Sequence, residues 1–355
     1  MPTPPPDAIG DSRTLVLAHL DGRPVDRLPA MPITMMFAAR LAGIRYRQYC
    51  TDYRLLAAAQ ALVAERFGFD HVSAISDPAR EAVDLGAAVT WFDDQPPALD
   101  DTRALLADRR VLAGLAPADP LGGGRMTDRV RGVDLLASTS GQTRLVEGWV
   151  EGPCAEAADL RGISALMLDF ADDPRFVDDL FGFAVDQAIS FAQAQVDAGA
   201  DLIGVGDAAA SLVGPAIYRE VVVPHEQRLI DGIHAMGARV RLHICGNTRR
   251  SVGAMARLGA DIVDLDYPVP LGQARLDAGP DQVLLGNLNP VAGLLSSTPS
   301  AIRDAMAACH RDAGSRYIAG AGCEIPAATP HEHVDALVEY ARSVRPDGSA
   351  AGAGP

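Results

Sequence analysis

Short apolar runs alternate with longer segments of helical period along most of this chain. The apolar runs predict eight strands, at Ala30–Met36, His71–Ser76, Arg144–Val150, Leu202–Gly206, Val240–Cys245, Ile262–Leu265, Val283–Gly286 and Arg316–Ala319. Apolar positions three and four residues apart predict helices at Asp52–Phe67, Pro174–Ala198, Pro215–Met236, Thr248–Leu258, Pro299–Ala313 and Pro330–Val344. Strands interleaved with helices in this number are typical of a (β/α)8 TIM barrel, and an open doubly wound sheet is the alternative.

The alternation is interrupted between the second and third predicted strands. Residues 77–137 contain a β-prone piece at Ala88–Phe92, a proline pair and a run of three glycines. We expect an elaborated region after strand two that lies over the barrel mouth. The barrel should form a single domain over residues 11–345. Residues 1–10 are rich in proline and residues 346–355 are polar and rich in glycine and alanine, so both ends are predicted to be disordered tails.

Composition and charge exclude several classes of function. The hydrophobic fraction of 48% and the charged fraction of 22% are typical of a soluble globular protein. A net charge of -15 argues against a nucleic-acid partner and against an anionic membrane surface. All 31 basic residues are arginine, which excludes lysine Schiff-base chemistry and a Walker A lysine. Neither a secretory signal nor an apolar run of about 20 residues is found, so we expect a cytoplasmic protein.

The chain has five cysteines, which is too few for a disulfide framework at this length. Cys245 lies two residues after His243 at the end of a predicted strand, so both side chains should project from the same face. Cys323 follows the last predicted strand. One nitrogen and two sulfurs suit a tetrahedral zinc ion with one position open for substrate. The alternative is that these are buried structural residues, as free cysteines often are.

Other polar residues also follow the predicted strands. In a parallel barrel the active site lies at the carboxyl ends of the strands, so these residues should gather on one face. Glu151 or Asp207 could supply a fourth metal ligand or accept a hydrogen bond from the His243 ring. The alternative is that these residues only cap helices or shape turns. The residues predicted to contact substrate are Asp77, Glu151, Asp207, Asn247 and Asn287.

Several stretches, in a fixed order along the chain, resemble the uroporphyrinogen decarboxylase superfamily, and specifically its zinc-containing methyltransferase branch. That branch is typified by methylcobamide:coenzyme M methyltransferases. The resemblance covers residues 25–345. It is carried by Ile75-Ser-Asp77, Glu81-Ala-Val-Asp-Leu-Gly86, Glu151-Gly-Pro153, Gly199-Ala-Asp-Leu-Ile203, Leu242-His-Ile-Cys-Gly-Asn247, Leu285-Gly-Asn-Leu-Asn-Pro290 and Gly322-Cys-Glu-Ile-Pro326.

The resemblance implies a (β/α)8 barrel in which His243, Cys245 and Cys323 hold zinc. It implies transfer of a methyl group from a methylcobamide to a thiol such as coenzyme M, or to another acceptor. Because the chain has no Asp-x-His-x-x-Gly sequence for binding cobalamin, a separate corrinoid protein is expected to present the cofactor. The sequence makes no prediction of the oligomeric state.

Three alternatives stay open on sequence grounds. The same zinc-thiolate chemistry could serve thiol addition to another electrophile, such as an epoxide. The chain could be a metal-free decarboxylase, since Asp77 occupies the position of that enzyme's essential aspartate; however, the arginine-rich signature expected near Met36–Tyr46 is incomplete. It could also be a corrinoid- or metal-binding accessory protein without turnover.

Overall fold

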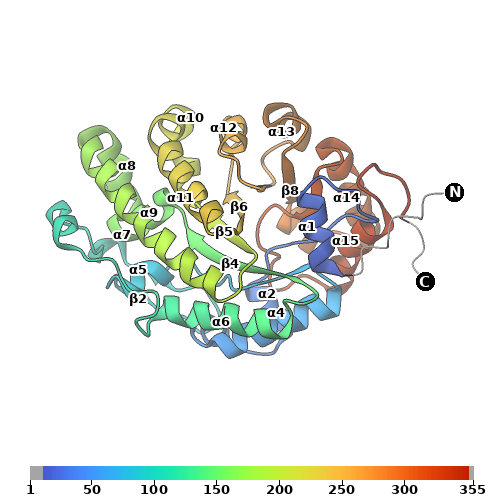
Figure 1. The fold of residues 1–355 in the computed structure, drawn as a ribbon, viewed down its shortest axis with the longest axis horizontal. Helices are drawn as coiled ribbons and strands as arrows, with labels where there is room; N and C mark the ends of the chain where they lie inside the picture. The colour runs from blue at the N-terminus through green and yellow to red at the C-terminus, as the bar shows by residue number, and fades with distance from the viewer. Residues whose placement is uncertain (1–10, 352–355) are drawn as a thin grey trace.

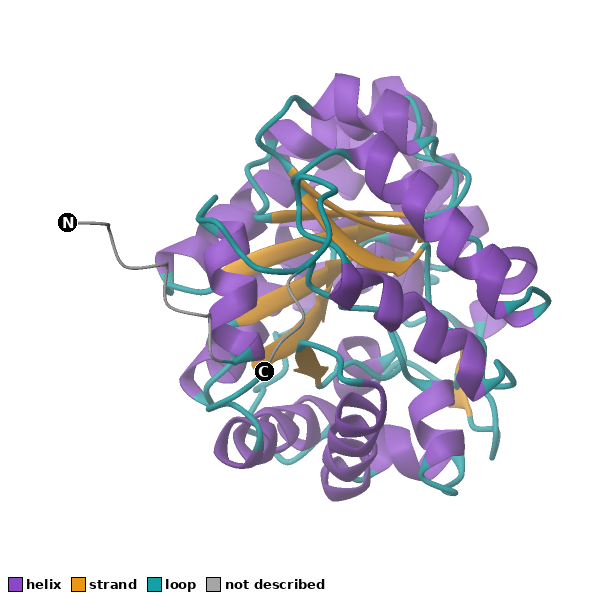
Figure 2. Ribbon diagram, turned by 90° about the vertical axis from the view of Figure 1, so that its right-hand side faces the viewer, coloured by secondary structure: helices purple, strands orange, loops and turns teal. Residues whose placement is uncertain are grey.

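The computed structural model describes residues 11–351, and a curved parallel sheet surrounded by helices forms its centre (Figures 1 and 2). The seven strands of the sheet are neighbours in the order in which they occur along the chain. They are β1 (His71–Ser73), β4 (Leu145–Glu151), β5 (Leu202–Gly206), β6 (Arg239–Ile244), β7 (Ile262–Leu265), β8 (Val283–Leu288) and β9 (Tyr317–Ala321). All of their pairings are parallel, so their carboxyl ends meet at one edge of the sheet.

The predicted strand Ala30–Met36 is wrong. Only Ala30 pairs, in a single parallel bridge to Ala319 of β9, and its carbonyl oxygen accepts from the N–H of Asp70, just before β1, at 3.0 Å. Residues 29–31 therefore lie between the two outer strands of the sheet. Pro29 and Pro32 lack the N–H that a ladder needs, which explains why no longer strand forms.

Helices form an outer layer around the sheet. The longer ones are α4 (Tyr53–Phe67), α6 (Arg125–Thr139), α8 (Ile163–Asp172), α9 (Pro174–Asp197), α11 (Val223–Ala235), α14 (Pro299–Ala313) and α15 (His331–Ser343). The shorter ones are α1 (Ser12–Leu20), α2 (Met36–Leu41), α3 (Tyr46–Thr51), α5 (Arg80–Asp84), α7 (Pro153–Arg161), α10 (Gly214–Ile217), α12 (Val252–Arg257) and α13 (Leu271–Ala278). No helix in residues 11–351 is long and apolar enough to cross a membrane.

The sequence sets the ends of α9 clearly. The Asp173 side chain caps the N-terminus by accepting from the N–H of Phe176, and Pro174 occupies the first turn, where its missing N–H costs nothing. Gly199 follows the helix with a φ of 104°, which ends it because other residues rarely adopt that conformation. Between these ends the helix packs against β4, β5 and α11.

The segment between β1 and β4 contains short elements of several kinds. It holds α5, the two-stranded hairpin β2 (Val89–Thr90) and β3 (Ala98–Leu99), and the 3-10 turns η1 (Asp101–Arg103) and η2 (Arg109–Gly114). From Arg125 onward the chain returns to the outer layer as α6, which packs against α4, α9 and β4. The irregular part is therefore shorter than the predicted region 77–137.

The predicted helix Pro215–Met236 is divided. It consists of α10, a π-helical turn η4 (Tyr218–Val222) and α11. A second π-helical turn, η5 (Pro290–Leu295), follows β8, and the 3-10 turn η3 (Ala208–Leu212) follows β5. All three turns lie in the connections that follow the carboxyl ends of β5 and β8.

The two predicted tails fall partly outside the described residues. Residues 1–10 and 352–355 are not described. Residues 346–351 form a turn in which Val344 bridges to Ala350, and the N–H of Ala351 donates to the carbonyl of Ser343 at 2.8 Å.

Candidate metal centre

Three potential metal ligands lie together at the carboxyl edge of the sheet. Nε2 of His243 is 3.0 Å from Sγ of Cys245, and that sulfur is 3.7 Å from Sγ of Cys323. All three ligand atoms lie within 4.8 Å of one another. The structure therefore brings the three residues that the sequence singles out into one cluster, although Cys245 and Cys323 are 78 positions apart in the chain.

Local backbone geometry fixes two of the three. β6 ends at Ile244, and Gly246, with a φ of 86°, turns the chain just after Cys245 while its N–H donates to Oδ2 of Asp266 at 2.6 Å. Before Cys323, a Cβ on Gly322 would lie 2.4 Å from the backbone nitrogen of Tyr267. Only glycine allows the loops after β7 and β9 to approach this closely, so Gly322 brings Cys323 to the cluster.

The His243 ring is held from inside the sheet. Its Nδ1 lies 2.9 Å from Oδ2 of Asp264, which faces His243 in the register of β6 and β7. Arg241 donates to the same carboxylate oxygen at 2.7 Å and 3.0 Å and contacts Glu147 at 3.2 Å. With Nδ1 directed at a carboxylate, Nε2 is the nitrogen that faces the sulfurs.

The site is strongly polarised. A hydrogen bond from Cys245, with help from the His243 ring, lowers the pKa of Cys323 to about 4, against the opposing effect of burial. Burial lowers the pKa of His243, but Cys245 and Asp264 outweigh burial and raise this pKa well above its ordinary value. The cluster thus carries a thiolate beside an imidazolium and binds protons that a cation would displace.

The donor set fits a soft divalent cation. Two sulfurs and one imidazole nitrogen are ligands that such ions prefer, and a carboxylate on the far nitrogen is the usual support for a metal-binding histidine. His243 is 4% exposed, while the two cysteines are half-buried, so the cluster opens outward on its sulfur side. Within the described residues no other group of histidine, cysteine and carboxylate side chains has this geometry.

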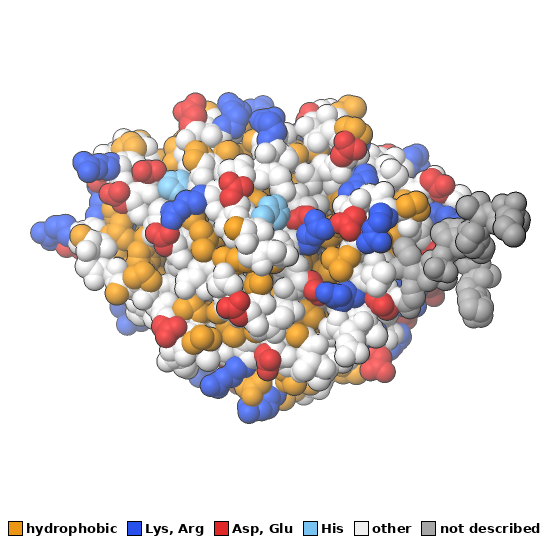
Figure 3. Space-filling view, viewed as in Figure 1, with side chains coloured by type: hydrophobic (Ala, Val, Ile, Leu, Met, Phe, Trp, Pro, Cys, Tyr) orange, Lys and Arg blue, Asp and Glu red, His pale blue; other side chains and the backbone are white. Residues whose placement is uncertain are grey.

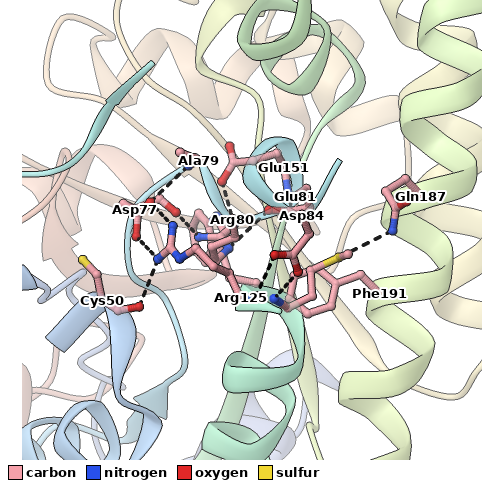
Figure 4. A network of polar contacts seen from close by, with 12 residues as sticks. Cys50, Asp77, Ala79, Arg80, Glu81, Asp84, Arg125, Glu151, Gln187 and Phe191 are labelled. Atoms are coloured by element: carbon pink, nitrogen blue, oxygen red, sulfur yellow. Dashed lines mark hydrogen bonds and ion pairs between the residues drawn. The ribbon is translucent and has the colours of Figure 1, made fainter. Parts of the chain in front are cut away.

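Asp77 lies in a different, buried network (Figure 4). Its two carboxylate oxygens accept from the two terminal nitrogens of Arg125 at 2.7 Å and 2.6 Å. This ion pair lowers the pKa of Asp77 to about 2, although burial acts in the opposite direction. Asp77 is only 1% exposed, so the structure engages this carboxylate with the protein's own arginine.

Glu151 belongs to the same network. It accepts from Arg80 at 2.8 Å, and its backbone N–H donates to Oε1 of Glu81 (Figure 4). Burial raises the pKa of Glu151 well above its ordinary value, and the neighbouring Glu81 adds to the effect of burial. Neither Glu151 nor Asp77 contacts the His243 ring.

Asp207 lies beside the metal-ligand cluster but faces away from its ligands. Its backbone N–H donates to the carbonyl of His243 at 2.9 Å, while its side chain accepts from the N–H of Ala155 at 2.6 Å. Burial raises its pKa to about 6. The carboxylate that lies against the His243 ring is Asp264, whereas the sequence suggests Glu151 or Asp207.

The two asparagines differ in their surroundings. Asn247 is exposed and lines a cavity of about 260 Å³ next to the cluster. Asn287 is buried, and its amide donates to the carbonyls of Asp266 at 3.1 Å and Val269 at 2.5 Å. Asn287 thus supports the loop after β7, whereas Asn247 has a face open to a ligand.

Sequence reasoning did not find Asp264 or Arg241. A carboxylate within the apolar run Ile262–Leu265, and an arginine two residues before His243 on the same strand face, are the signals that point to them. Charged residues inside apolar strands are expensive to bury, so each one requires a partner nearby.

Comparison with known proteins shows which proteins this chain resembles. The sequence model of the family "Uroporphyrinogen decarboxylase (URO-D)" matches residues 11–344. A methylcobamide:CoM methyltransferase, MtbA, from Methanosarcina mazei is 28% identical over 332 residues, which are 91% of this chain and 95% of that protein. A uroporphyrinogen decarboxylase from Nocardia farcinica is 31% identical over 270 residues, 74% of this chain and 73% of that protein.

A solved structure shares the fold. The methyltransferase from Methanosarcina mazei superimposes with a TM-score of 0.85, covering 93% of this chain and 98% of that one, at 23% sequence identity. The curved parallel sheet with its outer helices is therefore common to both.

Proposed function

This chain belongs to the uroporphyrinogen decarboxylase family, and we propose that it is a methyltransferase that moves a methyl group from a methylated corrinoid to a thiol. The observation that carries the proposal is the cluster of His243, Cys245 and Cys323 with ligand atoms within 4.8 Å. A porphyrinogen decarboxylase that works without metal has no use for two sulfurs and an imidazole at one point of the sheet edge.

In this proposal His243, Cys245 and Cys323 hold zinc. When bound, the zinc ion would stabilise the acceptor thiol as the thiolate, which is the nucleophilic form of sulfur. Two cysteinates and one neutral histidine balance the two positive charges of the cation. Asp264 keeps the far nitrogen of His243 occupied, so the ring keeps one tautomer and one orientation.

The transfer itself is a displacement at the methyl carbon. A sulfur–carbon bond forms as the cobalt–carbon bond breaks, and the electron pair of the broken bond stays on cobalt. The chain's own residues contribute position: the loops after β6 and β9 fix the ligands, and the exposed face of Asn247 is available to a polar part of the acceptor. A separate corrinoid protein presents the donor, and coenzyme M is one acceptor that fits.

The fold around the site and the location of the protein are also proposed. We propose a complete (β/α)8 barrel in which residues 29–31 take the eighth strand position, as a single domain over residues 11–345. The irregular segment after β1 would cover the site, Glu151 and Asp207 would line its wall, and the protein would act in the cytoplasm.

The decarboxylase alternative rests on the identity to the Nocardia relative and on Asp77. In this structure both carboxylate oxygens of Asp77 accept hydrogen bonds from Arg125. A substrate would have to displace a bidentate buried ion pair before reaching that carboxylate, which favours the methyltransferase assignment.

The test is a metal analysis joined to a transfer assay. Protein purified without chelators should contain about one zinc per chain and should consume methylcobalamin, followed by absorbance, when coenzyme M or another thiol is added. Cys323→Ser should lose both metal and activity, whereas the matched variant Cys309→Ser, a half-buried cysteine outside the cluster, should keep both. A protein that is free of zinc, or that transfers methyl equally well as Cys323→Ser, would refute the proposal.

A further inference from the structure

A groove lined by four arginines lies beside the loop that follows β6 and along α12. Its volume is about 450 Å³. Arg219 comes from the π-helical turn η4, Arg249 and Arg250 from the loop after β6, and Arg257 from the end of α12. Figure 3 shows basic side chains gathered at the edge of the molecule where α10 and α12 lie in Figure 1.

None of these four arginines forms an ion pair with a carboxylate among residues 11–351. Their situation differs from that of Arg125 and Arg241, which are each bound to buried acids. Asp277 is the one acidic residue in the groove lining, and its side chain accepts instead from Gln273 at 2.9 Å. With four arginines and one aspartate, the lining carries a net positive charge in a protein of net charge -15.

Apart from the arginines and Asp277, the groove is lined by small residues. Gly253 and Ala254 are its only other members, so no large apolar side chain forms part of it. Interfaces with other proteins are centred on buried aromatic and aliphatic side chains, which this groove lacks. Guanidinium groups, by contrast, match phosphate oxygens with two parallel hydrogen bonds. The lining thus favours a small anion over the face of another protein.

A second cavity adjoins the groove and includes Asn247, two residues after Cys245. It has a volume of about 260 Å³, shares Arg249 and Arg250 with the groove, and is otherwise lined in part by Ser211, Asn247 and Thr248. One side of the shared pair is therefore rich in guanidinium groups, and the other offers hydroxyl and amide groups. A ligand with adjacent anionic groups and an uncharged polar body would fill both.

We propose that this groove binds a small organic diphosphate, with its two phosphate groups among Arg219, Arg249, Arg250 and Arg257. Four guanidiniums are more than one phosphate can engage in bidentate fashion, which is why two adjacent groups fit better than one. The arginine groove contains none of the proposed metal ligands, so diphosphate binding does not depend on the function proposed above, although the adjoining cavity includes Asn247. The groove would bind its ligand through charge and shape, without forming or breaking a covalent bond.

Titration calorimetry of the full-length, metal-loaded protein tests the site. The probes are inorganic pyrophosphate, ADP, inorganic phosphate and citrate, each at low and at high salt. Pyrophosphate and ADP should bind with one site per chain, more tightly than phosphate and citrate, and more weakly at high salt. ADP tighter than pyrophosphate would indicate that the second cavity accepts the organic part, whereas equal affinities would limit recognition to the diphosphate itself.

Variants decide whether the arginines are responsible. The double variant Arg219→Gln/Arg257→Gln should weaken pyrophosphate binding by about tenfold or more for each guanidinium removed. The matched control Arg40→Gln/Arg131→Gln removes the same charge from two exposed arginines outside the groove and should bind like the wild type. Three results would overturn the assignment: equal affinity of the two double variants, equal binding of citrate and pyrophosphate, or no binding of any probe. The last result would favour an acidic protein surface as the ligand of the groove.

Discussion

Nδ1 of His243 lies 2.9 Å from Oδ2 of Asp264, and both side chains are almost fully buried. The contact joins neighbouring strands at matched positions, since His243 and Asp264 are partners in the register of β6 and β7. Arg241 binds the same carboxylate from beneath and so fixes its orientation. A buried carboxylate thereby sets which imidazole nitrogen faces the two sulfurs.

The first prediction concerns this contact. Asp264→Asn should lower the affinity for zinc by about 10- to 100-fold, because the amide no longer stabilises the ring orientation or raises the basicity of the ligand. Competition with a chromogenic chelator measures the affinity. Asp304→Asn, an exposed aspartate on α14, is the control and should bind zinc like the wild type. Unchanged affinity in the folded Asp264→Asn variant would contradict the role given to the carboxylate.

The second prediction concerns metal removal. After chelation, Cys323 should react with iodoacetamide at nearly the same rate at pH 6 and pH 8, because its pKa is lowered to about 4 and the thiolate is present throughout. The other thiols, such as Cys309, whose pKa is raised by burial, should react slowly and accelerate as the pH rises. Mass spectrometry of labelled peptides measures both rates. Zinc should protect Cys323; a Cys323 rate that follows the Cys309 pattern would count against the polarised cluster.

The sequence pattern located the metal ligands because strand alternation and strand ends are local properties. His243 and Cys245 are two residues apart, so strand alternation alone predicts that they share a face. Cys323 follows the last predicted strand, which alone predicts that it lies at the same edge of the sheet. Asp264 was missed because its role depends on the register between β6 and β7, which no local pattern encodes. The partner of Asp77 was missed for a similar reason: Arg125 lies 48 positions further on, at the start of α6.

The fold was predictable where apolar runs were free of proline. β5 and β7 agree with their predicted bounds, and α14 begins and ends at the predicted residues. The first predicted strand was wrong because Pro29 and Pro32 lack the backbone N–H groups that strand pairing needs, and a pattern of apolar residues does not show this. The π-helical turn between α10 and α11 was likewise not predicted, because it does not change the three- and four-residue spacing of apolar positions in the sequence.

The third prediction separates the two family activities through Asp77. Asp77→Asn should destabilise the fold by about 3–5 kcal/mol, because it leaves Arg125 buried without its partner. Methyl transfer per folded molecule should change little, since Asp77 does not contact the metal ligands. Chemical denaturation measures the first effect, and the methylcobalamin assay under native conditions measures the second.

The double variant Asp77→Asn/Arg125→Gln supplies the control for that ion pair. Removing both charges should recover part of the lost stability, so the two single effects should not add. Loss of transfer activity in a folded Asp77→Asn protein would show that the carboxylate takes part in chemistry, as it would in a decarboxylase. Additive destabilisation would show that the two charges are not coupled.

The fourth prediction concerns pH and Asp207. Burial raises the pKa of this carboxyl from its ordinary value of 3.8 to about 6, so between these pH values the folded protein holds a proton that the unfolded chain has released. This group therefore makes the unfolding free energy fall as the pH rises from about 4 to about 6, by up to about 3 kcal/mol. Asp207→Asn removes the titrating proton and should flatten that part of the stability profile, measured by urea denaturation at a series of pH values. Asp304→Asn should keep the wild-type slope, and a slope unchanged by Asp207→Asn would mean that the Asp207 carboxyl is ionised in the folded protein throughout this range.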